Sequence, residues 1–143
     1  MEEQLYYRTN LYRRLVLAKL FIEKNYQDNI NVDLIADESC FSKFHFIRLF
    51  KRIYGFTPHQ YLIRVRVDKA KELLEQDYPV EEVCALVGFE SVSSFSALFK
   101  RRNGISPSLY QLKRHRLRQD RKQRPHKYIP GCHILAFGFE SDL

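Results

Sequence analysis

Residues 34–61 read LIADESCFSKFHFIRLFKRIYGFTPHQY, and this stretch decides the fold. Four apolar side chains in its middle recur at the spacing i, i+3, i+4, i+7: Phe46, Leu49, Phe50 and Ile53. This spacing predicts a helix with one apolar stripe that packs against a core. Ser42 stands where an N-cap is expected, and Gly55 stands where the helix is expected to stop.

The opposite face of the same helix is unusual, because Phe44 and Ile47 share it with Lys43, Arg48 and Lys51. Apolar side chains among cations on an outward face raise the question of what partner this face meets. Two simpler readings of this face stay open. In the first, Phe44 or Ile47 is buried against a neighbouring loop or the C-terminal segment. In the second, Arg48 is only a solvated charge.

The stretch is repeated once in the chain. Shifted by 49 residues, 34–61 aligns with 83–110, VCALVGFESVSSFSALFKRRNGISPSLY, with ten of 28 positions identical. The identical pairs are Ala36/Ala85, Ser42/Ser91, Phe46/Phe95, Leu49/Leu98, Phe50/Phe99, Lys51/Lys100, Arg52/Arg101, Gly55/Gly104, Pro58/Pro107 and Tyr61/Tyr110. Most of them are expected caps, core positions and helix stops, so the sequence predicts a duplicated structural unit.

Each unit reads as a short helix, a tight turn and a longer helix. The short helices are expected at 32–38 and 80–87, with the repeated alanine on the inner face where the two helices cross. Gly88 is free to adopt a positive φ in the second turn. Thr57-Pro58 and Ser106-Pro107 are expected to start the following helices. This order is that of a helix-turn-helix, whose second helix enters a major groove of DNA.

Two further helices are expected around the units. Residues 10–26 carry apolar residues at helical spacing and are expected to pack on the first unit. Residues 58–76 are expected to form one connector between the units. A helix of that length spans ~28 Å, close to the ~34 Å between successive major-groove faces on one side of DNA.

Composition and charge narrow the partner. The chain has 143 residues, a net charge of +7 and a pI of about 9.4, which favours a polyanion. Residues 113–127 hold eight Lys/Arg and one acid, so this segment alone carries 8 − 1 = +7. We expect it to be an extended basic arm, with the last helix continuing into it as far as Pro125 at most.

The sequence offers little that points to an enzyme, a metal site or a membrane protein. The three cysteines, Cys40, Cys84 and Cys132, are widely spaced, which predicts reduced thiols in a cytoplasmic protein. His45 and His59 have no partner at ligand spacing, so no metal or other cofactor is expected. No apolar run reaches the ~18 residues of a membrane span, and the N-terminus lacks the pattern of a signal peptide.

The chain resembles the DNA-binding domain of AraC/XylS-type bacterial transcription regulators over roughly residues 10–112. Three motifs carry the resemblance: INVDLIADESCFSKFHFIRLFKRIYGFTPHQYL, the connector pattern Arg66-x-x-x-Ala70-x-x-Leu73-Leu74, and VEEVCALVGFESVSSFSALFKRRNGISPSLY. The resemblance implies an all-α fold of about seven helices, with two helix-turn-helix subdomains on a long connector helix. It also implies a transcription activator that binds two adjacent major grooves of double-stranded DNA and contacts RNA polymerase.

The resemblance assigns roles residue by residue. The implied base-contacting residues are Phe44, Ile47 and Arg48 in the first unit and Val92, Ser93, Ser94 and Ala97 in the second. In this role Arg48 can bond guanine O6 and N7, while Phe44 and Ile47 can pack on thymine methyl groups, so the first face fits a partner that offers methyl groups and phosphates together. The expected phosphate-contacting residues are Lys43, Lys51, Arg52, Lys100 and Arg101. Two departures predict weaker base reading by the second unit, since Ala97 and Gln111 stand where the family commonly has arginine. Arg66 is expected to be structural, because its motif places it near packed apolar positions.

The expected domain organisation is a first subdomain at 10–57, the connector at 58–76, a second subdomain at 77–112 and a tail at 113–143. Within the tail, HILAF at 133–137 reads as a short apolar strand. Two other function classes remain open. One is a DNA-repair methyl acceptor using Cys132 beside His133, and the other is a protein-interaction adaptor that binds no DNA.

Overall fold

The computed structural model describes residues 1–38 and 42–128, and within these residues all regular structure is helical. The elements are α1 (Glu2–Asn25), α2 (Val32–Glu38), α3 (Lys43–Tyr54), α4 (Pro58–Glu75), α5 (Val80–Leu86), α6 (Val92–Asn103), α7 (Pro107–Gln123) and the 3₁₀ helix η1 (Pro125–Tyr128). The expected seven-helix, all-α architecture is therefore confirmed.

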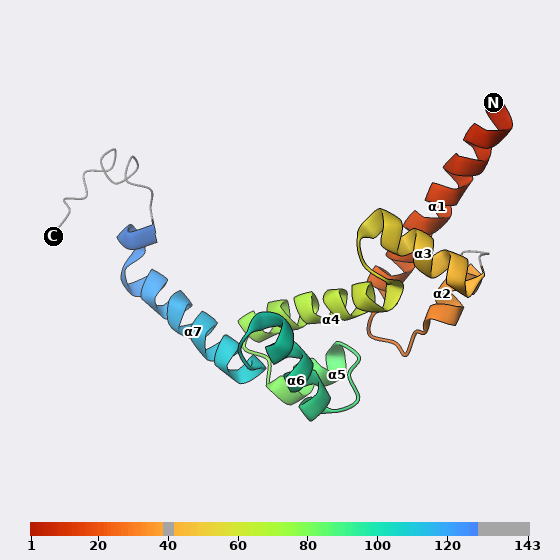
Figure 1. Cartoon of the computed structure of the whole chain (residues 1–143). Coiled ribbons are helices and arrows are strands. Elements are labelled where there is room, and N and C mark those ends of the chain that lie inside the picture. Colours follow the sequence, from red (N-terminus) through yellow and green to blue (C-terminus); the bar gives the residue numbers. More distant parts are fainter. Residues whose placement is uncertain (39–41, 129–143) are drawn as a thin grey trace.

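The arrangement is two three-helix lobes joined by α4 (Figure 1). The first turns of α4, with Tyr61 and Leu62, pack in one core with α1, α2 and α3, and side chains from Ile63 onward pack in a second core with α5, α6 and α7. The first core consists of Leu15, Ala18, Ile22, Ile35, Ala36, Phe46, Phe50 and Leu62. The second core consists of Ile63, Val67, Ala70, Leu74, Val83, Cys84, Val87, Phe95 and Phe99. Because α4 contributes buried side chains to both cores, it is an integral helix of both lobes and not a free linker.

Helix boundaries follow the expected caps in most places. Gly55 and Gly104 end α3 and α6 in the left-handed region, with φ of 79° and 80°. Thr57 begins α4 with a capping box to Gln60, and the Ser106 side chain accepts a bond from a backbone N–H at the start of α7. Ser42 occupies the N-cap position of α3, but its side chain makes no capping bond.

The expected start of the first helix at residue 10 is wrong, since α1 begins at Glu2. The intervening segment contains no proline or glycine, so nothing in it interrupts the helix. For the basic segment 113–127, the extended arm is wrong, and the expected continuation of the last helix as far as Pro125 is confirmed. α7 continues through Gln123 and stops just before Pro125, where the ring prevents a further helical turn.

The apolar stripe of α3 is narrower than its spacing predicts. Phe46 and Phe50 are fully buried, but Ile53 is 38% exposed. The ring of Tyr54 lies 4.7 Å from that of Phe50, and Tyr61 stacks on Tyr54. These two tyrosines fill the core side at the end of α3 and leave Ile53 outside it.

The repeated alanine is on the inner face in the first unit only. Ala36 is 2% exposed, whereas Ala85 is exposed and Cys84 takes the buried place in α5. The helix starts and the buried positions of the short helices agree at a shift of 48, since Val32 matches Val80, Ile35 matches Val83 and Ala36 matches Cys84. The shift of 49 holds from Ser42 onward, where the caps and buried positions of α3 and α6 correspond.

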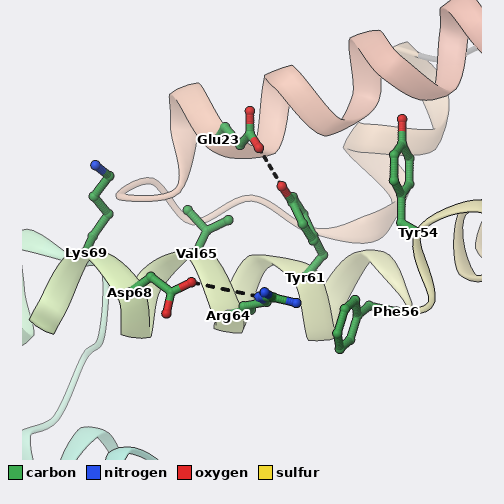
Figure 2. Close-up of a pocket in the computed structure, with 8 residues that line it drawn as sticks. All are labelled: Glu23, Tyr54, Phe56, Tyr61, Arg64, Val65, Asp68 and Lys69. Atoms are coloured by element: carbon green, nitrogen blue, oxygen red, sulfur yellow. Dashed lines mark hydrogen bonds and ion pairs between the residues drawn. The ribbon is translucent and has the colours of Figure 1, made fainter.

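A tyrosine fixes the start of α4 to α1 in the first lobe. Figure 2 shows the Tyr61 hydroxyl bonded to Glu23, beside an open pocket of about 580 Å³ along α4. Burial, followed by this hydrogen bond, raises the pKa of Tyr61 well above its ordinary value. The hydroxyl therefore remains a donor at any physiological pH.

Candidate nucleic-acid interface

The face of α3 that points away from the core is formed by Phe44, Ile47, Arg48 and Lys51, again at i, i+3, i+4, i+7. Phe44 is 77% exposed, Arg48 and Lys51 are exposed, and Ile47 is half-buried. The alternative in which Phe44 is buried within the described residues is therefore excluded. A single exposed apolar side chain is common on protein surfaces, but Phe44 beside Ile47, Arg48 and Lys51 gives this face apolar and cationic groups together.

The equivalent face of α6 carries much smaller side chains. Ser93, Ser94 and Ala97 are exposed, and Val92 lies at the first helical position with just over a third of its surface exposed. The Ser91 hydroxyl accepts a hydrogen bond from the Ser94 N–H at 3.2 Å and holds the N-terminus of α6 in place. α6 thus has the same length as α3 and ends at a glycine in the same way, but its exposed side chains offer fewer groups that could distinguish one base from another.

Four of the five expected phosphate-contacting cations are exposed on the last turns of α3 and α6: Lys51, Arg52, Lys100 and Arg101. Among the described residues, no carboxylate forms an ion pair with any of these four. Lys43 differs, because its Nζ lies 3.0 Å from Asp33 Oδ1 on α2. Its charge is partly neutralised, so a phosphate must compete with Asp33 for it.

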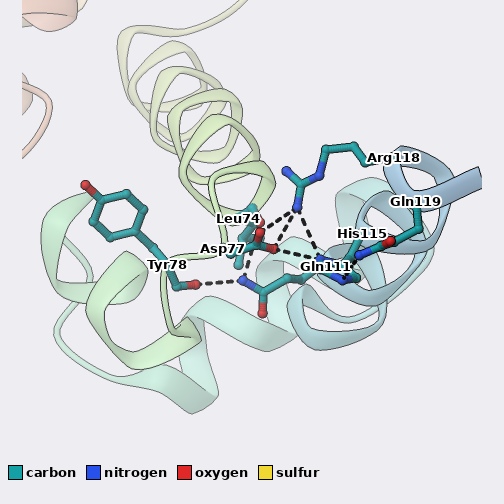
Figure 3. Close-up of polar contacts among 7 residues, drawn as sticks. All are labelled: Leu74, Asp77, Tyr78, Gln111, His115, Arg118 and Gln119. Carbon is teal, nitrogen blue, oxygen red and sulfur yellow. Dashed lines mark hydrogen bonds and ion pairs between the residues drawn. The ribbon is translucent and has the colours of Figure 1, made fainter. Parts of the chain in front are cut away.

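Gln111 is directed into the fold and not toward the reading face. Its Nε2 donates to the carbonyl oxygen of Tyr78 at 2.8 Å, just after α4, and to that of Leu74 at 3.3 Å, in the last turn of α4 (Figure 3). Gln111 therefore joins α7 to the end of α4 through backbone carbonyls.

A second contact beside Gln111 fixes α7 to the same turn. Asp77 has a positive φ of 65°, which is rare outside glycine, and its carboxylate receives two 2.7 Å contacts from Arg118 (Figure 3). Burial alone would raise the pKa of the Asp77 carboxyl, but hydrogen bonds and charge from Arg118 and His115 outweigh this and lower it. Two cations of the basic segment, Arg114 and Arg118, are thus used in ion pairs within the fold.

Arg66 is structural, as expected. Its side chain donates to backbone carbonyls in the loop after α1, and burial lowers the pKa of its guanidinium. Sequence reasoning inferred a packed position but not these partners, because they lie about 40 residues away in the chain.

Comparison with known proteins shows what this geometry is similar to. A helix-turn-helix domain family matches residues 35–113, which is more than half of the chain. The chain belongs to the AraC-type transcription regulators. The chain is 42% identical over 98 residues to a probable transcriptional regulator, LumQ, of Photobacterium leiognathi. The aligned part is 68% of this chain and 40% of LumQ, so the chain spans less than half the length of that relative. The chain is also 37% identical over 94 residues to the transcriptional activator AarP of Providencia stuartii, covering 65% of this chain and 70% of AarP.

A solved structure is similar over a larger share of the AraC-type domain. The DNA-binding domain of the global transcriptional factor AdpA, in complex with a target DNA, superposes with a TM-score of 0.67 at 31% identity. The match covers 78% of this chain and 96% of that one. The fold described here is thus the fold of a domain that has been solved on DNA.

Three further expectations concern membrane spans, metal sites and the cysteine thiols. Within the described ranges no helix combines the length and apolarity needed to cross a bilayer, and no cluster of three or more metal-ligating side chains occurs. Cys84 is a buried free thiol whose pKa is raised by burial. Cys40, Cys132 and the expected HILAF strand lie outside the described residues.

Proposed function

We propose that the chain binds a specific double-stranded DNA site, with α3 in one major groove and α6 in the next, and regulates transcription from that site. The observation that carries this proposal is the face of α3, where Phe44, Ile47 and Arg48 lie opposite the buried Phe46 and Phe50. Membership of the AraC-type regulators and similarity to a DNA-bound domain support it.

The chemistry of the two faces assigns different tasks to the two lobes. On α3, Arg48 donates two hydrogen bonds to a guanine while Phe44 and Ile47 contact thymine methyl groups. On α6, the contacts of Val92, Ser93, Ser94 and Ala97 discriminate weakly, because short side chains make few bonds to base edges. Lys51, Arg52, Lys100 and Arg101, with Lys43 in competition with Asp33, bind phosphates and set the register.

Regulation requires a further partner. In this proposal the outer surface of the bound protein contacts RNA polymerase in the bacterial cytoplasm and activates transcription. No catalytic step and no cofactor are part of it. Addition of the protein to transcription reactions with purified polymerase, on templates with and without the selected site, tests this part.

Selection of bound duplexes from a random library by the full chain tests DNA recognition directly. We expect a consensus with one sharp half-site, containing a guanine beside thymines, and one degenerate half-site about one helical turn away. Equal information in both halves contradicts the division of tasks, and the absence of any enriched sequence contradicts specific binding. An adaptor that binds no DNA gives the second result.

A further inference from the structure

Beside α4, Arg66 contacts residues of both lobes. The Arg66 Nε donates to the carbonyl oxygen of Tyr26 at 2.7 Å, and its Nη2 donates to that of Asp28 at 2.9 Å. Both carbonyls belong to the loop that leaves α1 in the first lobe. The same guanidinium lies 5.6 Å from the ring of Phe89, in the turn between α5 and α6 of the second lobe. One side chain of the connector therefore contacts both lobes.

Gly88 brings the second lobe directly against this loop. It has a φ of 86°, and a Cβ added to it would lie 2.6 Å from the carbonyl oxygen of Gln27 and 3.0 Å from that of Tyr26. Neither atom can move away easily, because both are backbone. In addition, Tyr26 packs against both hydrophobic cores. The helix-turn-helix turn of the second lobe thus rests on the backbone of the first.

We propose that this joint, formed by Arg66, residues 26–28 and the Gly88 turn, sets the distance and angle between α3 and α6. Arg66 is then a positioning residue that determines which spacing between the two DNA half-sites is preferred. The inference rests on the proposed function for its DNA readout, and it adds a specificity determinant that touches no base.

The physical basis is the helical geometry of DNA. Each base pair added between half-sites moves one of them by ~3.4 Å and rotates it by ~35° about the axis. A rigid joint matches one spacing well and others poorly. A loose joint accepts several spacings, but it binds the best one less tightly because its freedom is lost on binding.

An arginine suits this role better than a lysine. Its planar fork presents two donors in a fixed relation, so it holds two carbonyls at once, whereas an ammonium is a single point on a flexible stem. Arg64 provides a comparison variant of the same residue type. Two residues earlier on α4, it is rotated ~200° around the helix, pairs with Asp68, and lines the open pocket of Figure 2. It also lies 5.0 Å from the ring of Phe56 and shares a smaller pocket with Arg102 at the end of α6. R64A therefore tests whether loss of any α4 arginine near both lobes has the same effect as loss of the hydrogen bonds that Arg66 makes to the loop after α1.

The first test measures the dissociation constants of the full-length parent, R66A, R66K and R64A on the selected site with spacers changed by −2 to +2 base pairs. A duplex with only the sharper half-site is included. For the parent we expect a marked optimum. In R66A the ratio of dissociation constants between a one-base-pair change and the optimum falls about tenfold, or ~1.4 kcal/mol. Binding to the single half-site stays within about twofold of the parent in R66A.

R66K shows a smaller fall of the ratio, about threefold, and R64A keeps the parental ratio. Equal weakening of R66A at every spacing, with an unchanged ratio, means a merely structural role and overturns the proposal. If R66A does not fold, R66K is the deciding variant: a roughly threefold fall of the ratio supports the proposal, and an unchanged ratio overturns it.

The second test needs no DNA, so it separates failure of the joint from failure of the proposed function. Spin labels at R52C and R101C, in a chain with Cys40 and Cys132 replaced by serine, report the distance between the ends of α3 and α6. We expect a narrow distance distribution for the parent background and a broad one when R66A, or R66K if R66A does not fold, is added. A distribution that is already broad in the parent background, or that the added variant leaves unchanged, overturns the proposal. A parent that shows the narrow distribution but selects no duplex contradicts only the DNA-binding function.

Discussion

The hydroxyl of Tyr61 on α4 donates a hydrogen bond to Glu23 near the end of α1, 38 residues earlier in the chain. The second lobe repeats this contact, since the hydroxyl of Tyr110 on α7 donates to Glu75 Oε1 at 2.6 Å at the end of α4. In each lobe a tyrosine after the recognition helix thus anchors the next helix to the one that precedes the unit. The duplication extends to tertiary contacts and makes α4 equivalent to both α7 and α1.

Replacement of Tyr110 by phenylalanine tests this anchor. The hydrogen bond to a carboxylate is partly exposed, so Tyr110→Phe is expected to lower the free energy of unfolding by about 1 kcal/mol at pH 7. Burial and then the bond to Glu75 raise the pKa of Tyr110 to about 12 from a model-peptide value of 10.0. The parent therefore keeps this stabilisation below pH 10 and loses it as the pH rises toward 12.

Urea unfolding of parent and Y110F at pH 7 to 12 measures the effect, with Y12F on the exposed Tyr12 of α1 as the control. A difference in stability that stays constant to pH 12 contradicts the assignment.

The corrected alignment of the short helices makes a second prediction. Ala36 is buried in the first core and Ala85 is exposed, although the shift of 49 equates them. Ala36→Leu is expected to cost ~1–3 kcal/mol by overpacking, whereas Ala85→Leu should change stability by less than ~0.5 kcal/mol. Thermal melts of both variants measure the two losses of stability. Similar losses in Ala36→Leu and Ala85→Leu would contradict the shift of 48 and support the shift of 49 between the short helices.

The reading face gives a third prediction. Arg48→Ala is expected to weaken binding to the selected site by ~1–3 kcal/mol and to relax the preference at one base pair. Because Arg48 is exposed, the melting temperature should remain close to that of the parent. Phe50→Ala is the contrasting control, since it removes a fully buried ring and is expected to cost ~3–5 kcal/mol of stability. An R48A variant that melts early, or that binds every sequence as the parent does, shows that Arg48 does not read a base.

A fourth prediction concerns the basic part of α7. Lys113 and Arg116 are exposed, whereas Arg118 pairs with Asp77 and Arg114 with Glu75. If Lys113 and Arg116 contact phosphates, the double variant K113Q/R116Q binds all duplexes more weakly, and the slope of log K against log salt falls by ~0.9 per lost contact. Truncation after Leu112 is a poor substitute, because it also removes Arg114 and Arg118 and so loosens α7 from α4. A changed sequence preference with an unchanged salt slope would contradict a phosphate role.

Local sequence determined most of the secondary structure and the outline of the reading face. Caps such as Thr57 and stops such as Gly55 act over one helical turn, and the apolar spacing of Phe46 and Phe50 acts within one helix. Interactions of this range are fully contained in a short window of residues. Because the second unit repeats the sequence pattern of the first, the same caps and apolar spacing predicted its helices as well.

Only the tertiary structure decided which residues of similar character are buried and which contacts join the lobes. Ile53 lost its core position to Tyr54 and Tyr61, and Gln111 turned inward to two carbonyls at the end of α4. The Arg66 joint depends on backbone oxygens about 40 residues away. No local pattern encodes such partners, because a backbone carbonyl is the same group at every position and only packing determines which one a side chain reaches.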